Sequence, residues 1–577
     1  MDYKELYNDW LSNPYFDDET KAELEAIKTD EKEIEDRFYK ELEFGTAGLR
    51  GVIGAGTNRM NIYTVRKATQ GLANYIIKMH GQDRGVAISY DSRHMSPEFA
   101  DEAALCLNAN GIKAYVFDSL RPTPELSFAV RELKCIAGIN VTASHNPAEY
   151  NGYKVYWEDG AQITPPHDVG IMDAVGALHD YGKVKTMSKE DAVSEGLYIS
   201  IGKEIDDKYI EELKKLVVNS DAIKAVQKDI KIVYTPLHGT GNIPVQRVLK
   251  ELGFENVYVV KEQEKPDGAF PTVSYPNPEA AEAFELAVKL GNEVGADLLL
   301  ATDPDADRLG VYIKGSKPGT YHILTGNMSG CLLAEYEISQ LKEKGQLPED
   351  GALIKSIVST NLANDIAKYY GINLIEVLTG FKYIGEKMLE FETKNTGTYV
   401  FGFEESYGCL IGTHARDKDA VVATMALCEA VAYYKTKGMS LWDKMKEMYE
   451  RYGYWRDGVE SITLKGKEGI EKIQSTLETL RENIPDSIDN YKILSVRDYK
   501  KDTVTNMETG EVTTTGLPKS NVLYFDLSEE AWVCIRPSGT EPKLKFYYGV
   551  KGKDFDDANE KLKELGDYML NMINKML

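Results

Sequence analysis

The chain has 577 residues and a net charge of −24, with 68 Lys and Arg against 92 Asp and Glu. Its content of 42% hydrophobic and 28% charged residues is typical of a globular protein of several domains and excludes a disordered chain. A chain this acidic repels phosphate backbones and anionic lipids at long range, so we expect neither a nucleic-acid partner nor a membrane partner.

The cellular compartment is predicted from what the sequence lacks. It has no apolar run long enough to cross a membrane, and its N-terminus has no basic stretch followed by an apolar segment, as a secretory signal would. The cysteines are far apart, form no CxxC pair, and several lie in apolar stretches. We therefore expect a cytoplasmic protein with reduced, buried thiols, without disulfides or a zinc site. The cysteines are Cys106, Cys135, Cys331, Cys409, Cys428 and Cys534.

Strands and helices alternate along most of the chain, which is typical of parallel or mixed sheets with helices on their faces. Charged amphipathic helices are predicted over 17–43, and a helix from Ser96 to Gly111 is predicted with Ser96 as its N-cap and Pro97 at its first position. Strands of a first run are predicted at 86–90, 113–117 and 135–141. A second run has strands at 230–235, 256–260, 297–301 and 309–313 and a helix at 244–252. A third run has strands at 353–357, 373–377 and 399–401 and helices near 417–437 and 440–451.

The last section differs, because strands follow one another and a single long helix ends the chain. The strands are predicted at 459–464, 493–497, 522–525, 532–535 and 543–548. We therefore predict an α/β fold of three similar mixed-sheet domains followed by a C-terminal α+β domain. The predicted boundaries are 1–205, 206–322, 323–456 and 457–577.

The motif DPDADR places Asp303, Asp305 and Asp307 directly after an apolar strand. Three carboxylates at alternate positions repel one another unless a cation lies between them, and hard oxygen ligands favour Mg²⁺ or Ca²⁺. An EF-hand is excluded because its sixth and twelfth positions, Gly and Glu, are Arg308 and Lys314 here. A solvated acidic turn is disfavoured by the apolar strands on both sides.

The motif TASHNP places Ser144 at the end of a predicted strand, where its hydroxyl can face the rim of a sheet. Lys154, ten residues later, could return to the same place. An equally good interpretation of this motif alone is a turn whose polar residues only shape the backbone.

Further motifs are weaker when each is taken alone. RPSGTEP combines Arg536, Ser538, Gly539 and Thr540, which could bind a phosphate or form an ordinary loop. Two carboxylates and a hydroxyl in FEESYG suit the hydroxyls of a sugar, although a charged turn is the simpler interpretation. TGFK (379–382) and HGTG (238–241) indicate little alone, and no P-loop or dinucleotide-binding motif is present.

In this order, FGTAGLRG, TASHNP, DPDADR, FEESYG and RPSGTEP resemble the signatures of the α-D-phosphohexomutase family, over about 44–548. Length, FGTAGLRG and TPLHGTG are most similar to its longer bacterial phosphoglucomutase branch, which is related to animal phosphoglucomutase-2. The resemblance implies four domains around a central cleft. It also implies reversible interconversion of glucose 1-phosphate and glucose 6-phosphate through a phosphoserine enzyme and a glucose 1,6-bisphosphate intermediate, with Mg²⁺ as cofactor.

Several alternatives stay open at this point. Mannose or pentose phosphates could replace glucose phosphates as the small-molecule substrate. A Mg²⁺-dependent sugar phosphatase and a non-catalytic sugar-phosphate-binding protein are more distant alternatives. The sequence does not decide between a monomer and a dimer.

The resemblance also implies roles for individual residues. Ser144 would be the phosphoserine, and Asp303, Asp305 and Asp307 would bind Mg²⁺ together with it. Arg50, His145 and Lys154 match further catalytic positions of the cleft. Phe381 stands where some members carry histidine, so we assign it no acid–base role. The positions matched to substrate binding are Arg308, Thr379, Lys382, Glu404, Ser406, Arg536, Ser538, Gly539 and Thr540.

Overall fold

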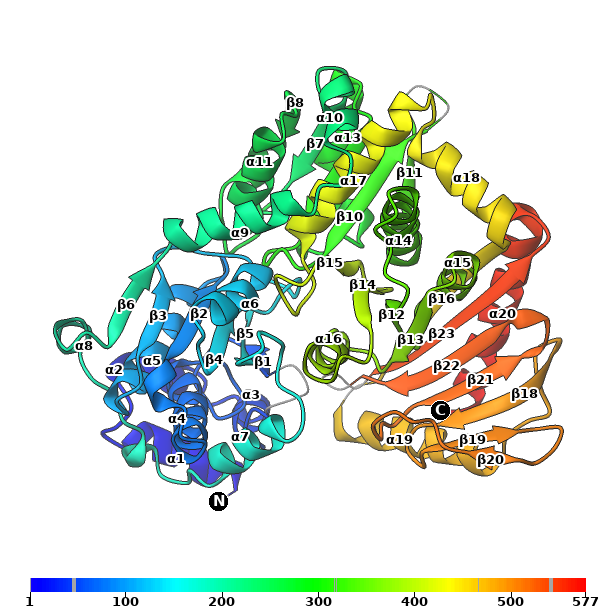
Figure 1. Cartoon of the computed structure of the whole chain (residues 1–577). Helices are drawn as coiled ribbons and strands as arrows, with labels where there is room; N and C mark the ends of the chain where they lie inside the picture. Colours follow the sequence, from blue (N-terminus) through cyan, green and yellow to red (C-terminus); the bar gives the residue numbers. More distant parts are fainter. Residues whose placement is uncertain (1, 44–47, 316, 318, 465, 539–542) are drawn as a thin grey trace. The chain divides into compact units, whose positions relative to one another are not determined.

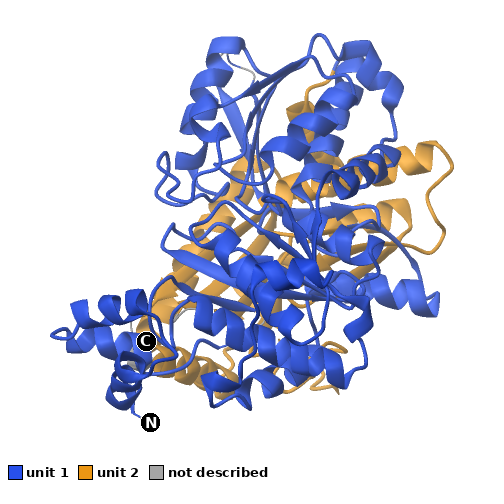
Figure 2. Ribbon diagram, turned by 90° about the vertical axis from the view of Figure 1, so that its left-hand side faces the viewer, with its two compact units in different colours: residues 1–325, 381–401, 406–438 blue, residues 326–380, 402–405, 439–577 orange. Residues whose placement is uncertain are grey.

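The computed structural model describes residues 2–43, 48–315, 317, 319–464, 466–538 and 543–577. The chain divides into two compact units (Figure 2). Unit 1 comprises residues 1–325, 381–401 and 406–438, and unit 2 comprises residues 326–380, 402–405 and 439–577. No helix among the described residues is both long and apolar enough to cross a lipid bilayer.

The first sheet of unit 1 has the strand order β1-β5-β4-β2-β3-β6 (Figure 1). Its strands are β1 (Leu49–Val52), β2 (Val86–Tyr90), β3 (Ala114–Phe117), β4 (Ala137–Val141), β5 (Tyr150–Trp157) and β6 (Tyr198–Ile201). Strand β2 runs parallel to β3 and β4, whereas β5 is antiparallel to both β4 and β1. The sheet therefore ends in an antiparallel pair that returns Lys154 toward the loop after β4.

Helices cover both faces of this sheet, which explains the continuous apolar runs of its inner strands. Helices α4 (Ile62–Lys78), α5 (Ser96–Ala109) and α7 (His167–Gly176) contribute to the core on one face. Helix α6 (Thr123–Glu132) packs against Gly138 on the other face, where an added Cβ would lie 2.5 Å from a Val130 methyl group. The predicted cap of α5 was wrong by one residue. Met95, with φ 63°, is the N-cap, and the Ser96 hydroxyl donates instead to Asp91.

The second sheet of unit 1 has the order β11-β10-β9-β7-β8. Its strands are β7 (Lys231–Thr235), β8 (Asn256–Val259), β9 (Leu298–Thr302), β10 (Leu309–Lys314) and β11 (Tyr321–Leu324). Strands β9 and β10 form an antiparallel pair in which Thr302 is opposite Leu309. DPDADR is therefore the connection of this hairpin. Helix α8 (Lys189–Ser194) packs against α5 and β6 of the first sheet, and α9 (Lys203–Lys215) contacts both α6 and α11. The other helices of this part are α10 (Ser220–Val226), α11 (Asn242–Glu251), α12 (Lys261–Glu264) and α13 (Glu285–Val294).

The N-terminal segment folds onto unit 1 as three short helices, α1 (Tyr3–Ser12), α2 (Asp18–Ala26) and α3 (Glu31–Phe38). An aspartate side chain caps the N-terminus of each helix, at Asp2, Asp17 and Asp30. Helices were predicted only from residue 17 onward. Trp10 stacks on Phe16 in an aromatic core that includes Tyr63 of α4, so the acidic segment is anchored by apolar packing.

The segment from 381 to 438 contributes α16 (Lys382–Lys394), β14 (Thr398–Glu404), β15 (Gly408–Ile411) and α17 (Ala420–Thr436). Helix α17 packs against α10 and α11 within unit 1. In unit 2, β12 (Gly351–Ser356) pairs in parallel with β13 (Asn373–Val377). Helices α14 (Gly326–Glu343), α15 (Leu362–Tyr370) and α18 (Leu441–Tyr452) accompany this pair.

The C-terminal part of unit 2 is an antiparallel sheet with the order β16-β23-β22-β21-β18-β19-β20. Its strands are β16 (Tyr454–Thr463), β18 (Tyr491–Asp498), β19 (Thr503–Asn506), β20 (Val512–Thr513), β21 (Leu523–Leu527), β22 (Trp532–Pro537) and β23 (Lys543–Gly552), and β17 (Ser487–Ile488) pairs with β18. Helices α19 (Gly466–Glu482) and α20 (Phe555–Met576) share a core with the sheet. The predicted class, α/β sheets followed by a C-terminal α+β part, is confirmed. Helix α19 was not predicted. The predicted domain boundaries stay a prediction.

Candidate active site

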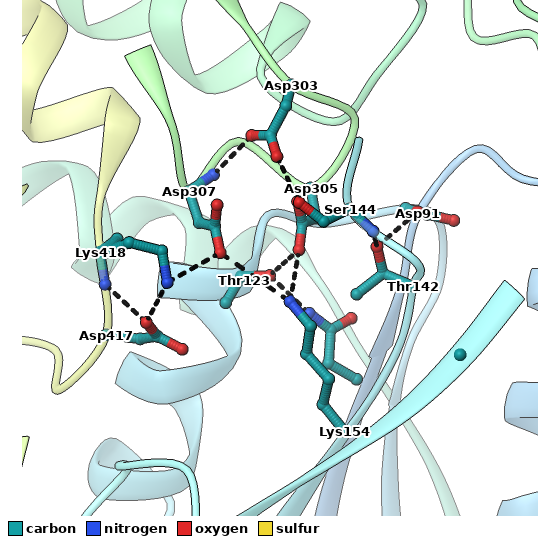
Figure 3. Close-up of polar contacts among 12 residues, drawn as sticks. Asp91, Thr123, Thr142, Ser144, Lys154, Asp303, Asp305, Asp307, Asp417 and Lys418 are labelled. Carbon is teal, nitrogen blue, oxygen red and sulfur yellow. Dashed lines mark hydrogen bonds and ion pairs between the residues drawn. The ribbon is translucent and has the colours of Figure 1, made fainter. Parts of the chain in front are cut away.

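Ser144 lies just after β4 in a left-handed backbone conformation, with φ 51° and only 3% of its surface exposed. Its backbone N–H donates to the Thr142 hydroxyl over 2.8 Å (Figure 3). Its own hydroxyl donates to Asp303 Oδ2 over 2.6 Å and lies 3.2 Å from His145 Nδ1. The chain therefore aims the Ser144 oxygen at the DPDADR connection.

The three aspartates of DPDADR are buried, and each offers an oxygen within 4.8 Å of the others. The second oxygen of Asp303 accepts the backbone N–H groups of Asp307 and Arg308, each over 3.1 Å. Burial, with the charges of Asp305 and Asp307, raises the pKa of Asp303 well above its usual range. The charges of Asp305 and Asp307 therefore oppose ionisation of Asp303, the carboxyl group that the Ser144 hydroxyl faces.

Two lysines approach the same carboxylates from other elements (Figure 3). Lys154 Nζ lies 2.9 Å from Asp305 Oδ2 and 3.8 Å from Asp307 Oδ2. Lys418 Nζ lies 3.2 Å from Asp307 Oδ2. Burial alone would raise the pKa of Asp305, but Lys154 and the hydrogen bonds to this carboxylate outweigh it and hold that pKa below its usual range. The two ammonium groups therefore partly compensate the aspartates.

Two carboxylate oxygens of the aspartate cluster accept no hydrogen bond from the described residues and fit a divalent cation. Asp305 Oδ1 and Asp307 Oδ1 are buried and have no hydrogen-bond partner among the residues that the structure describes; Asp307 Oδ1 lies 3.8 Å from Arg308 Nε. Buried acceptors are nearly always satisfied, so these oxygens are available to a bound group. Hard carboxylate oxygens are the ligands that Mg²⁺ and Ca²⁺ prefer.

The DPDADR connection is held in place by two other loops. The backbone N–H of Thr240 donates to Pro304 O over 2.8 Å, and that of Thr123 donates to Asp305 O over 2.9 Å. An added Cβ at Gly239 would lie 2.4 Å from Pro304 Cα. HGTG, which indicates little as a sequence, therefore requires glycine because the aspartate connection packs directly against it.

Two arginines and a neutral histidine surround the Ser144 loop. Arg50 of β1 donates to Asn146 Oδ1 over 3.0 Å. Burial, then the charges of Arg308 and Arg50, lower the pKa of His145 well below its usual range, so its imidazole is neutral at pH 7. Arg308 Nη1 lies 3.1 Å from Glu279 Oε1. The structure thus brings Arg50, His145, Lys154 and Arg308 near Ser144 and the aspartates.

The remaining predicted residues of the FEESYG and TGFK motifs are divided between the two units: Lys382 and Ser406 belong to unit 1, and Thr379 and Glu404 belong to unit 2. Lys382 is buried at the start of α16 and lines a cavity of about 500 Å³ with Trp157, His167 and Glu386, and burial lowers its pKa. In unit 2, Glu404 Oε1 accepts the backbone N–H of Gly380, the residue after Thr379, over 2.7 Å. Ser406 is half-buried and begins the return of the chain to unit 1.

The predicted phosphate loop follows β22 in unit 2. Arg536 is the penultimate residue of β22 and is half-buried. The backbone N–H of Ser538 donates to Lys543 O over 2.7 Å, which closes the base of the loop. Gly539 and Thr540 lie outside the described residues, as do the first four residues of FGTAGLRG. The role of this loop therefore stays a prediction.

Comparison with known proteins identifies the family. Family models of phosphoglucomutase/phosphomannomutase alpha/beta/alpha domains I, II and III match residues 41–181, 207–316 and 325–452. The phosphoglucomutase of Staphylococcus haemolyticus is 37% identical over 526 residues, covering 91% of this chain and 93% of that protein. The phosphoglucomutase of Staphylococcus saprophyticus is 35% identical and covers 99% of both chains. The chain belongs to the phosphoglucomutase/phosphomannomutase family.

Two statements follow from membership in this family. The relatives that span nearly the whole chain show that its function is that of a phosphoglucomutase, which is an isomerase that transfers a phosphoryl group within one molecule. The fold is shared with the open form of parafusin, a phosphoglucomutase from Paramecium, with a TM-score of 0.68 at 18% identity over 92% of this chain and 95% of that chain. The predictions of family, function and enzyme class are confirmed.

Several residues that shape this phosphoglucomutase site were missed in the sequence. Thr123 donates through its hydroxyl to Asp305 Oδ2 over 2.8 Å, and Asp417 accepts the Lys418 ammonium over 2.9 Å. Asp91 and Arg93 follow β2 and support the Ser144 loop. Their place directly after a predicted strand was a usable signal. No local signal marks Asp417 and Lys418, because tertiary structure alone brings them to the aspartates.

Proposed function

We propose that Ser144 carries the phosphoryl group in this phosphoglucomutase, and that glucose 1,6-bisphosphate is the intermediate between glucose 1-phosphate and glucose 6-phosphate. The observation that supports this role is the 2.6 Å hydrogen bond from the Ser144 hydroxyl to the buried aspartate cluster. Phosphoryl transfer depends mainly on positioning and on compensation of charge, and both are features of this site.

Asp303, Asp305 and Asp307, together with an oxygen of phosphorylated Ser144, would hold Mg²⁺. When bound, this cation supplies compensation for the charge on the phosphoryl oxygens. The buried Asp305 Oδ1 and Asp307 Oδ1 atoms, which lack hydrogen-bond partners among the described residues, support this assignment.

The chain's own residues orient the first transfer. The phosphorylated Ser144 presents its phosphorus to the free hydroxyl of the hexose phosphate, the bond from phosphorus to Ser144 Oγ breaks, and a bond to the sugar oxygen forms. The proton that the sugar hydroxyl loses replaces the phosphoryl group on Ser144 Oγ. Arg308 and Arg50 offer cationic donors beside the loop, while Lys154 keeps Asp305 charged and in place. After transfer, the Ser144 hydroxyl donates to Asp303, the arrangement that the structure has.

The second transfer requires the bisphosphate to turn over, so that its other phosphate reaches Ser144. One distal anchor must then accept the sugar in both orientations. We assign this anchor to Arg536 with Ser538, Gly539 and Thr540, and the sugar hydroxyls to Glu404 and Ser406 with Thr379 and Lys382. The Gly380 N–H that holds Glu404 Oε1 supports the role of Glu404, because it fixes that carboxylate before substrate binds.

The test is to incubate the purified protein with glucose 1-phosphate, Mg²⁺ and a trace of glucose 1,6-bisphosphate labelled with ³²P. We expect glucose 6-phosphate, no stoichiometric release of inorganic phosphate, and label on the peptide that contains Ser144. Release of inorganic phosphate without isomer would indicate a phosphatase instead. Catalytic efficiencies with mannose, glucosamine and ribose 1-phosphates, which we expect to be lower than with glucose 1-phosphate, test the choice of sugar.

A further inference from the structure

One buried arginine binds the backbone of the whole Ser144 loop. Arg93 is 1% exposed, and its Nη1 donates to Pro147 O over 2.8 Å and to Tyr150 O over 3.1 Å. Its Nη2 donates to the carbonyl oxygens of Ser144 and Asn146. A single guanidinium therefore satisfies four carbonyl groups of one turn, which a lysine or a neutral side chain cannot do with the same planar geometry.

Asp91 completes the arrangement from the other side of Ser144. The Thr142 hydroxyl accepts the Ser144 N–H over 2.8 Å and donates to Asp91 Oδ2 over 2.6 Å (Figure 3). Asp91 Oδ2 also lies 3.3 Å from Arg93 Nε, and Asp91 Oδ1 accepts the Arg93 N–H over 3.0 Å. Asp91 therefore holds the Ser144 N–H through the Thr142 hydroxyl, and Arg93 holds the Ser144 carbonyl directly.

Such support is required because of the backbone of Ser144. A φ of 51° is disfavoured for a residue with a side chain, and it persists only where the surroundings over-determine it. The ring of Phe270 also holds Arg93 in place, because the Arg93 guanidinium carbon lies 5.0 Å from the centre of that ring. Loss of the guanidinium would let the turn relax and move the Ser144 oxygen from Asp303.

We propose that Arg93, oriented by Asp91 and Phe270, is the positioning residue that keeps the Ser144 oxygen in line for phosphoryl transfer in both directions. The proposal rests on the proposed role of Ser144 as the phosphoryl carrier. Arg93 binds the backbone of the loop and none of the reacting atoms, so it acts through Ser144. Its loss should therefore slow the transfer while leaving sugar binding nearly intact.

The test compares Arg93→Lys with the wild-type enzyme and with Arg59→Lys. Arg59 is a matched control because it is also buried in unit 1 and donates to backbone carbonyls, those of Asp36 and Asn58, but to none of the Ser144 loop. Three quantities are measured: kcat and KM for glucose 1-phosphate, the rate at which glucose 1,6-bisphosphate phosphorylates Ser144 by intact-protein mass spectrometry, and the melting temperature.

We expect Arg93→Lys to lower kcat and the phosphorylation rate together by about a hundred-fold, the effect typical of a misplacement near 1 Å. KM should change by less than about threefold, because the loop carbonyls do not bind the sugar in this proposal. Arg59→Lys should lower the melting temperature as much as Arg93→Lys does, while kcat stays near the wild-type value.

Phe270→Leu keeps the proposal testable if Arg93→Lys does not fold, because it removes only the ring beneath the guanidinium. It should lower kcat by a factor between about two and thirty, which is the free energy of a cation–π contact converted to a ratio of rates. Wild-type kcat in the folded Arg93→Lys or Phe270→Leu variant would overturn the proposal, and so would equal losses of kcat in Arg93→Lys and Arg59→Lys. If the wild-type enzyme itself is not phosphorylated on Ser144, the proposed function fails instead.

Discussion

Ser144 and Asp303 are 159 positions apart in the chain, yet the hydroxyl of one donates to the carboxylate of the other over 2.6 Å. They come from two different sheets of unit 1, and Thr123 joins these sheets. Its N–H binds Asp305 O over 2.9 Å, and its hydroxyl binds Asp305 Oδ2 over 2.8 Å. The proposed phosphoryl carrier and the proposed cation ligands therefore belong to one compact unit.

Ser144→Ala should abolish mutase activity while the fold persists. The substitution removes the oxygen that would carry the phosphoryl group, and loss of a nucleophile costs at least about a thousand-fold in turnover. Activity is measured in a coupled assay for glucose 6-phosphate, with circular dichroism as the check on folding. Ser127→Ala is the matched control, a buried serine whose hydroxyl donates to Gly160 O, and it should keep its activity. Near-wild-type turnover in Ser144→Ala would rule out this carrier.

Asp305→Asn should weaken Mg²⁺ binding by at least about tenfold, since even residues that only support metal ligands cost that much. The measurements are titration calorimetry with Mg²⁺ and the melting temperature with and without the ion. Ligand linkage predicts that a given Mg²⁺ concentration stabilises the wild-type protein more than the variant. A chelator should abolish wild-type activity, and added Mg²⁺ should restore it. Asp101→Asn, at a surface ion pair with Lys189, serves as the control, and equal Mg²⁺ affinity in both variants would contradict the assignment.

The fold could be predicted where local pattern and tertiary environment agree. The strand predicted at 86–90 has the same bounds as β2, because a strand that is buried on both faces is a continuous apolar run. Strand β5 was missed, since its Asn-Gly pair is typical of a turn and only pairing with β1 and β4 makes it a strand. Helix α19 did carry a signal, because Ile473, Leu477 and Leu480 recur at helical spacing and join the core.

The candidate site could be predicted only as far as its residues are marked by motifs. Ser144 and the aspartates each follow a strand, so the sequence placed them at sheet ends before the structure did. Lys418 approaches Asp307 to 3.2 Å from a segment more than a hundred residues later, and no spacing in the sequence indicates this. Arg93 follows a predicted strand, which was a usable signal, but its hydrogen bonds go to backbone carbonyls, so the neighbouring side chains do not indicate its partners.

Stability should depend on pH through Asp457 of β16. Burial raises the pKa of Asp457 from 3.8 to about 6, and its Oδ1 has no hydrogen-bond partner among the described residues. A carboxyl group whose folded pKa is raised stabilises the fold below its unfolded pKa, and this contribution is lost as the pH rises through the folded value. The loss between pH 4 and pH 7 is about 2 kcal/mol for a shift of about two units.

Asp457→Asn should therefore be more stable than the wild-type protein at pH 7.5 and equal to it near pH 4. Denaturant unfolding at the two pH values measures the difference. Asp502→Asn is the control, because the pKa of the half-buried Asp502 is shifted in the opposite direction by the Thr515 and Thr514 hydroxyls. A variant that is destabilised equally at both pH values would contradict a raised pKa at Asp457.

The cysteines should be inert in the native protein. All six are buried, and burial raises the pKa of Cys106, Cys135 and Cys534 to about 12. Because the thiolate is the reactive form, an aromatic disulfide reagent at pH 8 should modify fewer than about one thiol per chain before unfolding and leave activity unchanged. Rapid modification of a thiol under native conditions would show that at least one of them is accessible.

Arg536→Ala tests the proposed distal anchor in unit 2. If Arg536 binds the non-reacting phosphate, its loss removes a charge-assisted contact worth about 1.5–3 kcal/mol, or roughly ten- to a hundred-fold in affinity. KM for glucose 1-phosphate should rise by that factor, and both directions of the reaction should be affected, since the anchor serves both sugar orientations. Arg536→Lys should restore only part of the loss, because lysine keeps the charge but not the planar fork.

The measurement is steady-state kinetics in both directions at saturating glucose 1,6-bisphosphate. Lys500→Ala, an exposed ion-pair partner of Glu478 in the same unit, is the control for lost positive charge and should leave KM unchanged. Unchanged catalytic efficiency in Arg536→Ala would place the phosphate anchor on other residues.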